Sequence, residues 1–156
     1  MNYTNTLADY TSLNSSIQHH YFGGDMDLGQ RVALSENNLN QIKTIRSFLL
    51  LKENWDSYNA EKPSPEAIIK AISFSLWLSQ RDIEIFFTAP IADGDILVEI
   101  KNGNGNVEFV FSVNAEDKIL AWCDGDLKAE EQINDTTRDA YLKWLICPDG
   151  NCPDFR

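Results

Sequence analysis

Basic residues are scarce in this chain of 156 residues. It carries 13 Lys and Arg against 24 Asp and Glu, which gives a formal net charge of −11 at pH 7. The phosphate backbone of nucleic acids and anionic membrane surfaces both repel a protein surface of this sign. We therefore expect no direct binding to nucleic acid or to a membrane. The partner that this charge favours is another protein with a basic surface.

Histidine is also scarce. The two histidines, His19 and His20, are adjacent in the sequence. Adjacent side chains on an extended segment point to opposite sides, so both histidines cannot easily bind one metal ion. A Ser or Cys nucleophile that needs a histidine base would require this N-terminal segment to dock on the rest of the chain. We expect no catalytic set, no metal site and no cofactor.

Cysteines and long apolar runs are few. The three cysteines, Cys123, Cys147 and Cys152, leave one unpaired in any disulfide scheme, which fits a reducing compartment. A pairing of Cys147 with Cys152 stays open. No apolar run approaches the roughly 18 residues of a membrane span, and the polar start MNYTNTLADYTSLNSS is unlike a signal peptide. The expected location is the cytoplasm.

Glycine-rich ligand loops are missing. The Gly-Asn-Gly of residues 103–105 lies between two predicted strands, so it predicts a hairpin rather than a phosphate loop. The two Asp-Gly-Asp triplets, 93–95 and 124–126, lie at strand boundaries and lack the spaced ligands of a calcium loop. Both triplets predict turns.

Apolar residues are abundant enough for a packed core. They make up 43% of the chain and include 8 Phe, 5 Tyr and 4 Trp. Residues 36–146 are predicted to form a single α+β domain. Residues 1–35, interrupted by Gly23, Gly24 and Gly29, are expected to be a loosely structured N-terminal arm, and residues 147–156 a C-terminal tail.

Two helices are predicted in the first half of the domain. Ser35 is a candidate N-cap for residues 36–55, and Ser64 followed by Pro65 and Glu66 is a strong start signal for a second helix. Apolar residues at spacings of three and four define the expected buried stripes. The stripes are Leu39, Ile42, Ile45, Phe48 and Leu49 in the first helix, and Ile68, Ile69, Ile72, Leu76 and Trp77 in the second.

After Arg81 the apolar period changes to two. Residues 83–88, 95–101, 106–113 and 118–123 are predicted to form four strands joined by short turns, which indicates an antiparallel meander. Within 95–101, the residues Ile96, Val98 and Ile100 share one face and Glu99 and Lys101 the other. Residues 129–145 are predicted to form a C-terminal helix. The expected fold is a two-layer α+β sandwich in which three helices cover a four-stranded sheet.

Two segments carry a resemblance to a group of small bacterial and phage proteins. They are NWDSYNAEKPSPEA, residues 54–67, and a later segment with Pro90, ADGDI at 92–96 and VEI at 98–100. The group pairs an NWDGYGA-x-PPSPEA element with a P-x-ADGGI-x-LEW hairpin, and the resemblance spans residues 49–126. It implies the architecture and no particular activity. Ser57 and Asn59 stand where the group has glycines, which should stiffen the loop.

The loop at residues 54–60 allows two interpretations. In the first, Trp55 and Tyr58 fold back over the helices as a lid on the core, and Asp56 accepts hydrogen bonds from nearby backbone amides. In the second, Trp55, Asp56 and Tyr58 contact a partner, since exposed aromatic residues are enriched at binding hot spots.

The acids of the C-terminal third are the second candidate site. Between residues 116 and 139 there are eight acids and three bases. The expected partner-binding acids are Glu116, Asp117, Asp124, Asp126, Glu130 and Glu131. The function favoured by the sequence is a non-catalytic protein of the antitoxin, immunity or inhibitor type, which binds and neutralises a partner protein.

Two alternatives remain open from the sequence. An acidic nucleic-acid mimic, anti-CRISPR-like, would inhibit a nuclease or another defence protein, and it requires the acids to lie on one face at phosphate-like spacing. A small metal-dependent enzyme would use the polar residues of the arm. Those residues are His19, His20, Asp25 and Asp27.

Overall fold

The computed structural model describes residues 34–103 and 105–146, which belong to a compact unit that begins at Val32. The expected arm, except for its last two residues, and the expected tail lie outside the described residues. So do His19, His20, Asp25, Asp27, Cys147 and Cys152.

The helices begin where the capping residues predict. Helix α2 spans Glu36–Ser47 and continues as a short 3-10 helix, η1, over Phe48–Leu50; helix α3 spans Pro65–Ser79. The hydroxyl of Ser35 accepts a hydrogen bond from the Asn38 amide at 3.1 Å, and that of Ser64 from the Glu66 amide at 3.2 Å. Both predicted N-caps are confirmed. The first helix is shorter than the expected range of residues 36–55. Helix α2 ends at Ser47, and the 3-10 turn that follows it ends at Leu50.

The sheet is an antiparallel meander of five strands rather than four. The strands are β1 (Phe87–Pro90), β2 (Ile96–Asn102), β3 (Gly105–Phe111), β4 (Lys118–Cys123) and β5 (Asp126–Gln132), in the order β1-β2-β3-β4-β5. Ile96, Val98 and Ile100 of β2 are buried on the face toward the helices, as their spacing predicts.

Strand β5 corrects the expectation that residues 129–145 form one helix. Asp124 and Gly125 have φ of 54° and 85°, and two left-handed residues make a tight hairpin turn that sends the chain straight back along β4. Helix α4 begins only at Asp135 and ends at Ile146. Its start is marked by Asn134, whose Oδ1 accepts from the Thr137 amide at 3.0 Å.

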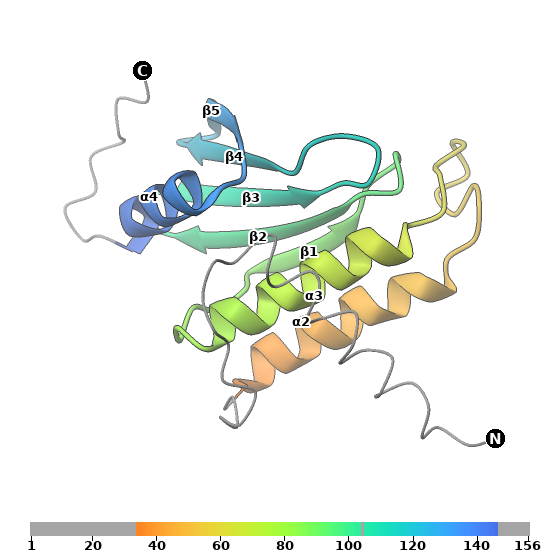
Figure 1. The fold of residues 1–156 in the computed structure, drawn as a ribbon, viewed down its shortest axis with the longest axis horizontal. Coiled ribbons are helices and arrows are strands. Elements are labelled where there is room, and N and C mark those ends of the chain that lie inside the picture. The colour runs from red at the N-terminus through yellow and green to blue at the C-terminus, as the bar shows by residue number, and fades with distance from the viewer. Residues whose placement is uncertain (1–33, 104, 147–156) are drawn as a thin grey trace. The chain divides into compact units, whose positions relative to one another are not determined.

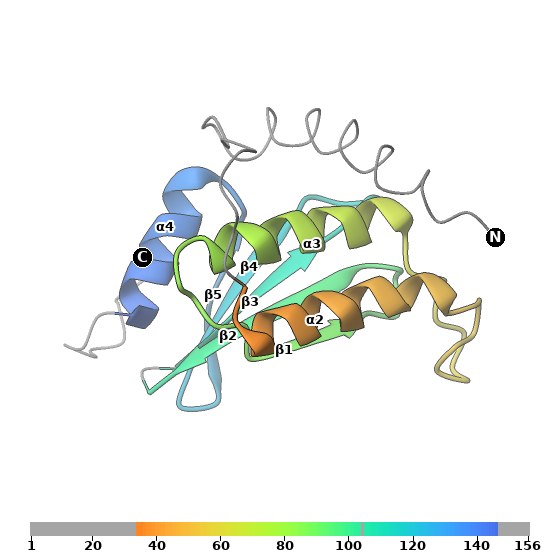
Figure 2. The same cartoon turned by 90° about the horizontal axis from the view of Figure 1, so that it is seen from below.

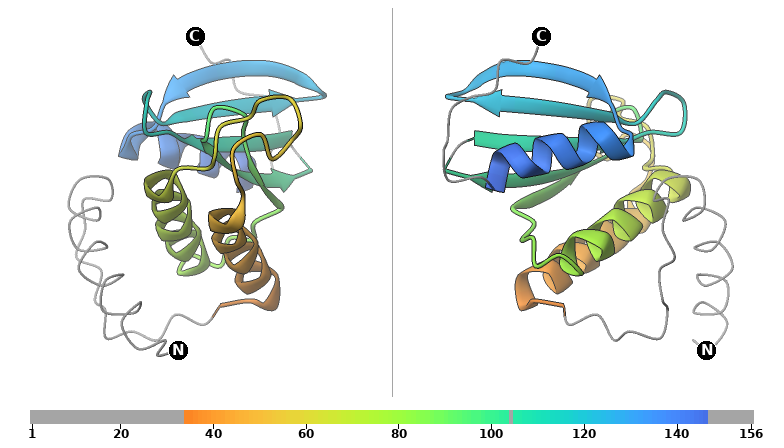
Figure 3. Two further views of the ribbon diagram at one scale, coloured as in Figure 1. Left: turned by 90° about the vertical axis from the view of Figure 1, so that its right-hand side faces the viewer. Right: turned by 60° about the vertical axis from the view of Figure 1, so that its left-hand side comes forward.

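All three helices lie on one face of the sheet (Figures 1, 2 and 3). Helix α2 packs on β1, α3 on β2 and β3, and α4 on the central strands. The core between the layers centres on Phe74 of α3, whose ring centroid lies 4.5 Å from that of Phe109 and 5.3 Å from that of Phe111. The two-layer α+β architecture is confirmed. The opposite face of the sheet is covered by no described element.

The apolar periodicity of the two long helices gives only part of their buried faces. In α2 the polar Asn38 is 2% exposed, whereas Leu39 is 37% exposed. In α3 the most deeply buried positions include the small residues Ala67, Ala71 and Ser75. The expected stripe residues Ile69, Ile72 and Leu76 are only half-buried. Small side chains allow α3 to approach its neighbours closely. Its buried face therefore includes the positions of these small residues as well as part of the expected stripe.

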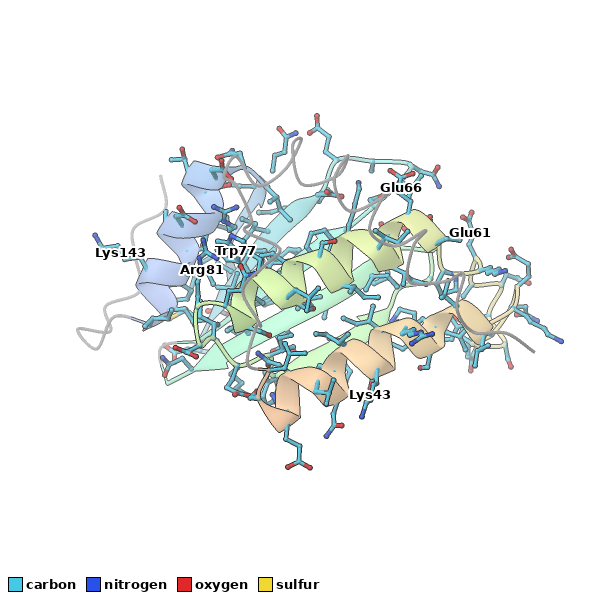
Figure 4. All side chains as sticks on the ribbon, turned by 60° about the horizontal axis from the view of Figure 1, so that its bottom comes forward. Lys43, Glu61, Glu66, Trp77, Arg81 and Lys143 are labelled. Carbon is cyan, nitrogen blue, oxygen red and sulfur yellow. The ribbon has the colours of Figure 1, made fainter. Side chains whose placement is uncertain are left out.

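The end of α3 is joined to α4 through an aromatic ring. The guanidinium carbons of Arg81 and Arg138 lie 3.8 and 4.1 Å from the ring centroid of Trp77. Figure 4 shows Trp77 and Arg81 beside α4. Arg138 also pairs with Asp135 and Asp139 of its own helix, both at 2.9 Å.

Candidate functional site

The loop at residues 54–60 is closed by its own hydrogen bonds. The Asn54 amide donates to the Ala60 carbonyl at 2.8 Å. Oδ1 of Asp56 accepts from the amides of Tyr58 at 2.7 Å and Ala60 at 3.1 Å, as the first interpretation of this loop expects. Trp55 is half-buried, and its Nε1 donates to the Glu61 carbonyl at 3.0 Å. Tyr58 is 87% exposed, so it does not form part of a lid on the core.

This loop and the β1–β2 turn form one structural unit. The Glu61 amide donates to the Ala92 carbonyl at 2.7 Å, and the Ser64 amide donates to the Gly94 carbonyl at 2.9 Å. Gly94 has a φ of +80°, and a Cβ there would lie 3.0 Å from the Lys62 carbonyl oxygen. The two segments therefore lie against each other.

The acids predicted to bind a partner do not share one face. Glu116 and Asp124 lie at opposite ends of β4, and the adjacent acids Glu130 and Glu131 of β5 point to opposite sides of the sheet. Glu131 lies opposite the buried Ile119 and accepts from the Tyr141 hydroxyl at 2.8 Å. This scatter argues against the nucleic-acid mimic, which needs its acids side by side.

Asp117 is a correction to the predicted set of exposed acids. It is only 6% exposed. Its Oδ1 lies 3.2 Å from Nζ of Lys70 and accepts from the Ser112 amide at 2.8 Å. Its Oδ2 is buried with no hydrogen-bond partner among the described residues. Burial raises the pKa of Asp117, while the Ser112 hydrogen bond and Lys70 oppose that change. The pair fastens the loop after β3 to α3 and offers no surface to a partner.

The uncovered face of the sheet brings together residues that the sequence analysis did not select. The strand register aligns one row across all five strands. From β1 to β5 this row consists of Phe87, Glu99, Glu108, Leu120 and Glu130. We call the surface made by this row and its neighbours on the same side the open face.

The rows beside it add further apolar area to the open face. Leu97 lies opposite Val110 on one side, and Trp122 lies opposite Asn106 and Leu127 on the other. Leu97, Val110 and Trp122 are half-buried, and Leu127 is 44% exposed. In the central row Phe87 is 49% exposed. An antiparallel sheet with one solvated face normally carries polar residues there, so this apolar content needs an explanation.

Two carboxylates face each other at the centre of the open face. Glu99 of β2 is the direct cross-strand partner of Glu108 of β3. Burial raises the pKa of Glu99, the charge of Glu108 raises it further, and Lys101 and a hydrogen bond from Asn106 oppose this. Neither glutamate lies within 4.0 Å of a basic group of the described part of the chain.

The two lysines of the open face are engaged elsewhere. Nζ of Lys101 lies 5.0 Å from the ring centroid of Phe86, and Nζ of Lys118 lies 2.7 Å from Oε1 of Glu130. The carboxylate pair thus has apolar side chains at both ends of its row and makes no ion pair within 4.0 Å in the described part of the chain, although the charge of Lys101 acts on Glu99. A signal for this surface exists in the sequence. Strands β2, β3 and β4 carry apolar residues at both odd and even positions, which point to opposite sides of the sheet.

Comparison of the chain with protein-family models, with curated proteins and with solved structures finds no match. None of the described helices is long and apolar enough to span a membrane. Among the described residues, no group of three or more His, Cys, Asp or Glu side chains is placed to hold a metal ion.

Proposed function

We propose that this chain is a non-catalytic interaction protein, of the antitoxin, immunity or inhibitor type, which binds and neutralises a partner protein through the open face of its sheet. The observation that carries the proposal is the composition of that face. It presents Phe87, Leu97, Val110, Leu120 and Trp122 around two acids, with no described helix over it. Apolar patches of this kind mark interaction sites on soluble domains.

The charge of the open face supports a partner with a basic surface. Glu99 and Glu108 occupy its centre and Glu130 its β5 edge. Complementary charge speeds association and selects among partners, while apolar and aromatic contacts supply most of the affinity. The net charge of −11 also attracts a basic partner, at longer range.

The loop at residues 54–60 takes a smaller part in this proposal. Trp55 and Asp56 make hydrogen bonds that hold the loop in shape, so we assign them to its structure. The side chain of Tyr58 is exposed to solvent, and we assign it a second contact with the partner. Hot spots require burial on binding, which an exposed tyrosine can provide.

Affinity capture from the native host tests the proposal with two matched variants. Leu120→Lys places a charge on the open face that opposes a basic partner. Leu50→Lys makes the same change at a position that is 81% exposed and lies in η1, on the other side of the molecule's sheet layer. A stoichiometric partner should be retained by the parent and by Leu50→Lys and lost by Leu120→Lys.

The captured protein must then bind the purified parent chain and the Leu50→Lys variant, and it must not bind the Leu120→Lys variant. Thermal melts of both variants control for unfolding. Retention of the partner by Leu120→Lys, or capture of no stoichiometric protein by the parent, would count against the proposal.

A further inference from the structure

The facing carboxylates of Glu99 and Glu108 break a pairing rule of antiparallel sheets. Like charges on directly opposite residues destabilise the sheet, because their Cβ atoms lie only about 5 Å apart. Lys101 and a hydrogen bond from Asn106 offset part of this cost at Glu99, but no described cation makes an ion pair with either glutamate, since Lys101 lies over Phe86 and Lys118 pairs with Glu130. Violations that are compensated only in part are expected where a position serves function rather than stability.

The surroundings of the pair strengthen any ion pair made there. Lys101 and Asn106 lie in the row on one side of the pair. Phe87 and Leu120 flank the two glutamates along their own row, and Leu97 and Val110 lie in the row on the other side. These side chains displace water, so the local dielectric is lower than at a fully exposed site. The raised pKa of Glu99 reports the same desolvation.

We propose, on the basis of the proposed function, that Glu99 and Glu108 together receive one arginine side chain of the partner protein, carried on a segment with apolar residues on both sides of that arginine. The planar guanidinium has five N–H donors and can bond two carboxylates at once. An ammonium is compact and more strongly hydrated, so lysine is the poorer match. The ring of Phe87 lies beside Glu99 in the same row, and a guanidinium can stack on that ring.

Three short peptides test this recognition directly on the full chain. They are acetyl-Leu-Val-Xaa-Val-Leu-amide with Xaa as arginine, citrulline or lysine. Citrulline keeps the shape of arginine and removes its charge. In titrations followed by amide NMR shifts, the arginine peptide should shift the signals of Glu99 and Glu108. It should bind at least about tenfold more tightly than the citrulline peptide, with the lysine peptide between them.

Matched charge variants assign the effect to the pair. The double variant Glu99→Gln/Glu108→Gln should lose the preference for arginine over citrulline. The double variant Glu116→Gln/Asp124→Asn removes the same charge at two exposed positions outside the open face. It should keep the preference for arginine over citrulline. Equal binding of the arginine and citrulline peptides, or an unchanged preference in the Glu99→Gln/Glu108→Gln variant, would overturn the inference.

Failure of the inference is distinguishable from failure of the proposed function. If Leu120→Lys abolishes partner capture but Glu99→Gln/Glu108→Gln leaves it unchanged, the open face binds the partner without the arginine contact. If Leu120→Lys leaves capture intact, the open face is not the binding surface and both proposals fall.

Discussion

Nζ of Lys70 lies 3.2 Å from Oδ1 of Asp117, and both side chains are buried. The ammonium also donates to the Ser112 carbonyl at 2.7 Å, and Oδ1 of Asp117 accepts from the Ser112 amide. One lysine of α3 thereby holds the two ends of the loop that connects β3 to β4. An ion pair in the interior is costly to break from one side, because the remaining charge is left without a partner.

Lys70→Met should therefore lower the free energy of unfolding by about 3 to 5 kcal/mol. The double variant Lys70→Met/Asp117→Asn should recover part of that loss, because the amide keeps an acceptor for the Ser112 amide and carries no charge. Urea unfolding of the parent, both single variants and the double variant measures the coupling. A loss under about 1 kcal/mol for Lys70→Met would show that the ion pair contributes little.

The burial of Asp117 could not be read from its surroundings in the sequence. It stands beside Glu116 in an acidic stretch, and its partner Lys70 is 47 residues away on another element. Local patterns do report capping and turns, which is why Ser35, Ser64 and the Asp124-Gly125 turn were predicted correctly. Pairing between distant elements leaves no comparable local mark.

The same distinction explains the missed strand and the missed surface. Residues 126–132, DLKAEEQ, contain good helix formers, and pairing with β4 overrides that preference. The open face was missed because Glu99 and Lys101 suggested a polar outer side for β2. Recognising the apolar contribution of Leu97, Val110 and Trp122 requires the register across three strands.

Asn38 and Leu39 provide a second test of the packing. Nδ2 of Asn38 donates to the Ser79 hydroxyl at 3.0 Å and the Ile83 carbonyl at 2.9 Å, and its Oδ1 accepts from the Ile85 amide at 2.8 Å. Asn38→Ala should lower the free energy of unfolding by about 2 to 3 kcal/mol, because it leaves the buried Ile85 amide unpaired. Leu39→Ala should cost less than about 1 kcal/mol at its exposed site. Chemical denaturation that ranked the two in the opposite order would contradict the assigned helix face.

Ser57 tests whether the loop at residues 54–60 carries backbone strain. Its φ is 67°, a conformation that glycine adopts without strain. Ser57→Gly should hold or raise the free energy of unfolding by up to about 1 kcal/mol, and Ser57→Val should lower it by more than about 1 kcal/mol. Ser47→Gly is the control, since Ser47 has a φ of −65° and a glycine there should destabilise. A loss of stability in Ser57→Gly equal to that in Ser47→Gly would rule out the strain.

Glu99 makes the stability of the domain depend on pH with a defined sign. Its pKa is raised above the ordinary value of 4.5 in the folded state, by burial first and by Glu108 second. Ionisation of Glu99 therefore destabilises the fold above the folded-state pKa, and the penalty disappears as the pH falls below the unfolded-state value. Glu99→Gln should raise the melting temperature at pH 7 and bring no gain at pH 3.5.

The melts of Glu99→Gln need a variant with the same charge change outside the open face. Glu116→Gln serves, because Glu116 is exposed in the loop after β3. An increase in melting temperature at pH 7 that is equal in both variants would assign the effect to net charge. A lower melting temperature for Glu99→Gln at pH 7 would contradict the predicted sign.

Trp55 and Tyr58 separate stability from recognition within one loop. Trp55 is half-buried and its Nε1 donates to the Glu61 carbonyl, so Trp55→Ala should lower the free energy of unfolding by about 2 kcal/mol, less than for a fully buried tryptophan. Tyr58 is 87% exposed and Tyr58→Ala should leave the melting temperature within about 1 °C, since surface truncations change stability little. Binding of the captured partner, measured by calorimetry, then decides the role of the tyrosine. A loss of affinity in Tyr58→Ala places the loop at the edge of the interface, whereas unchanged affinity confines recognition to the open face.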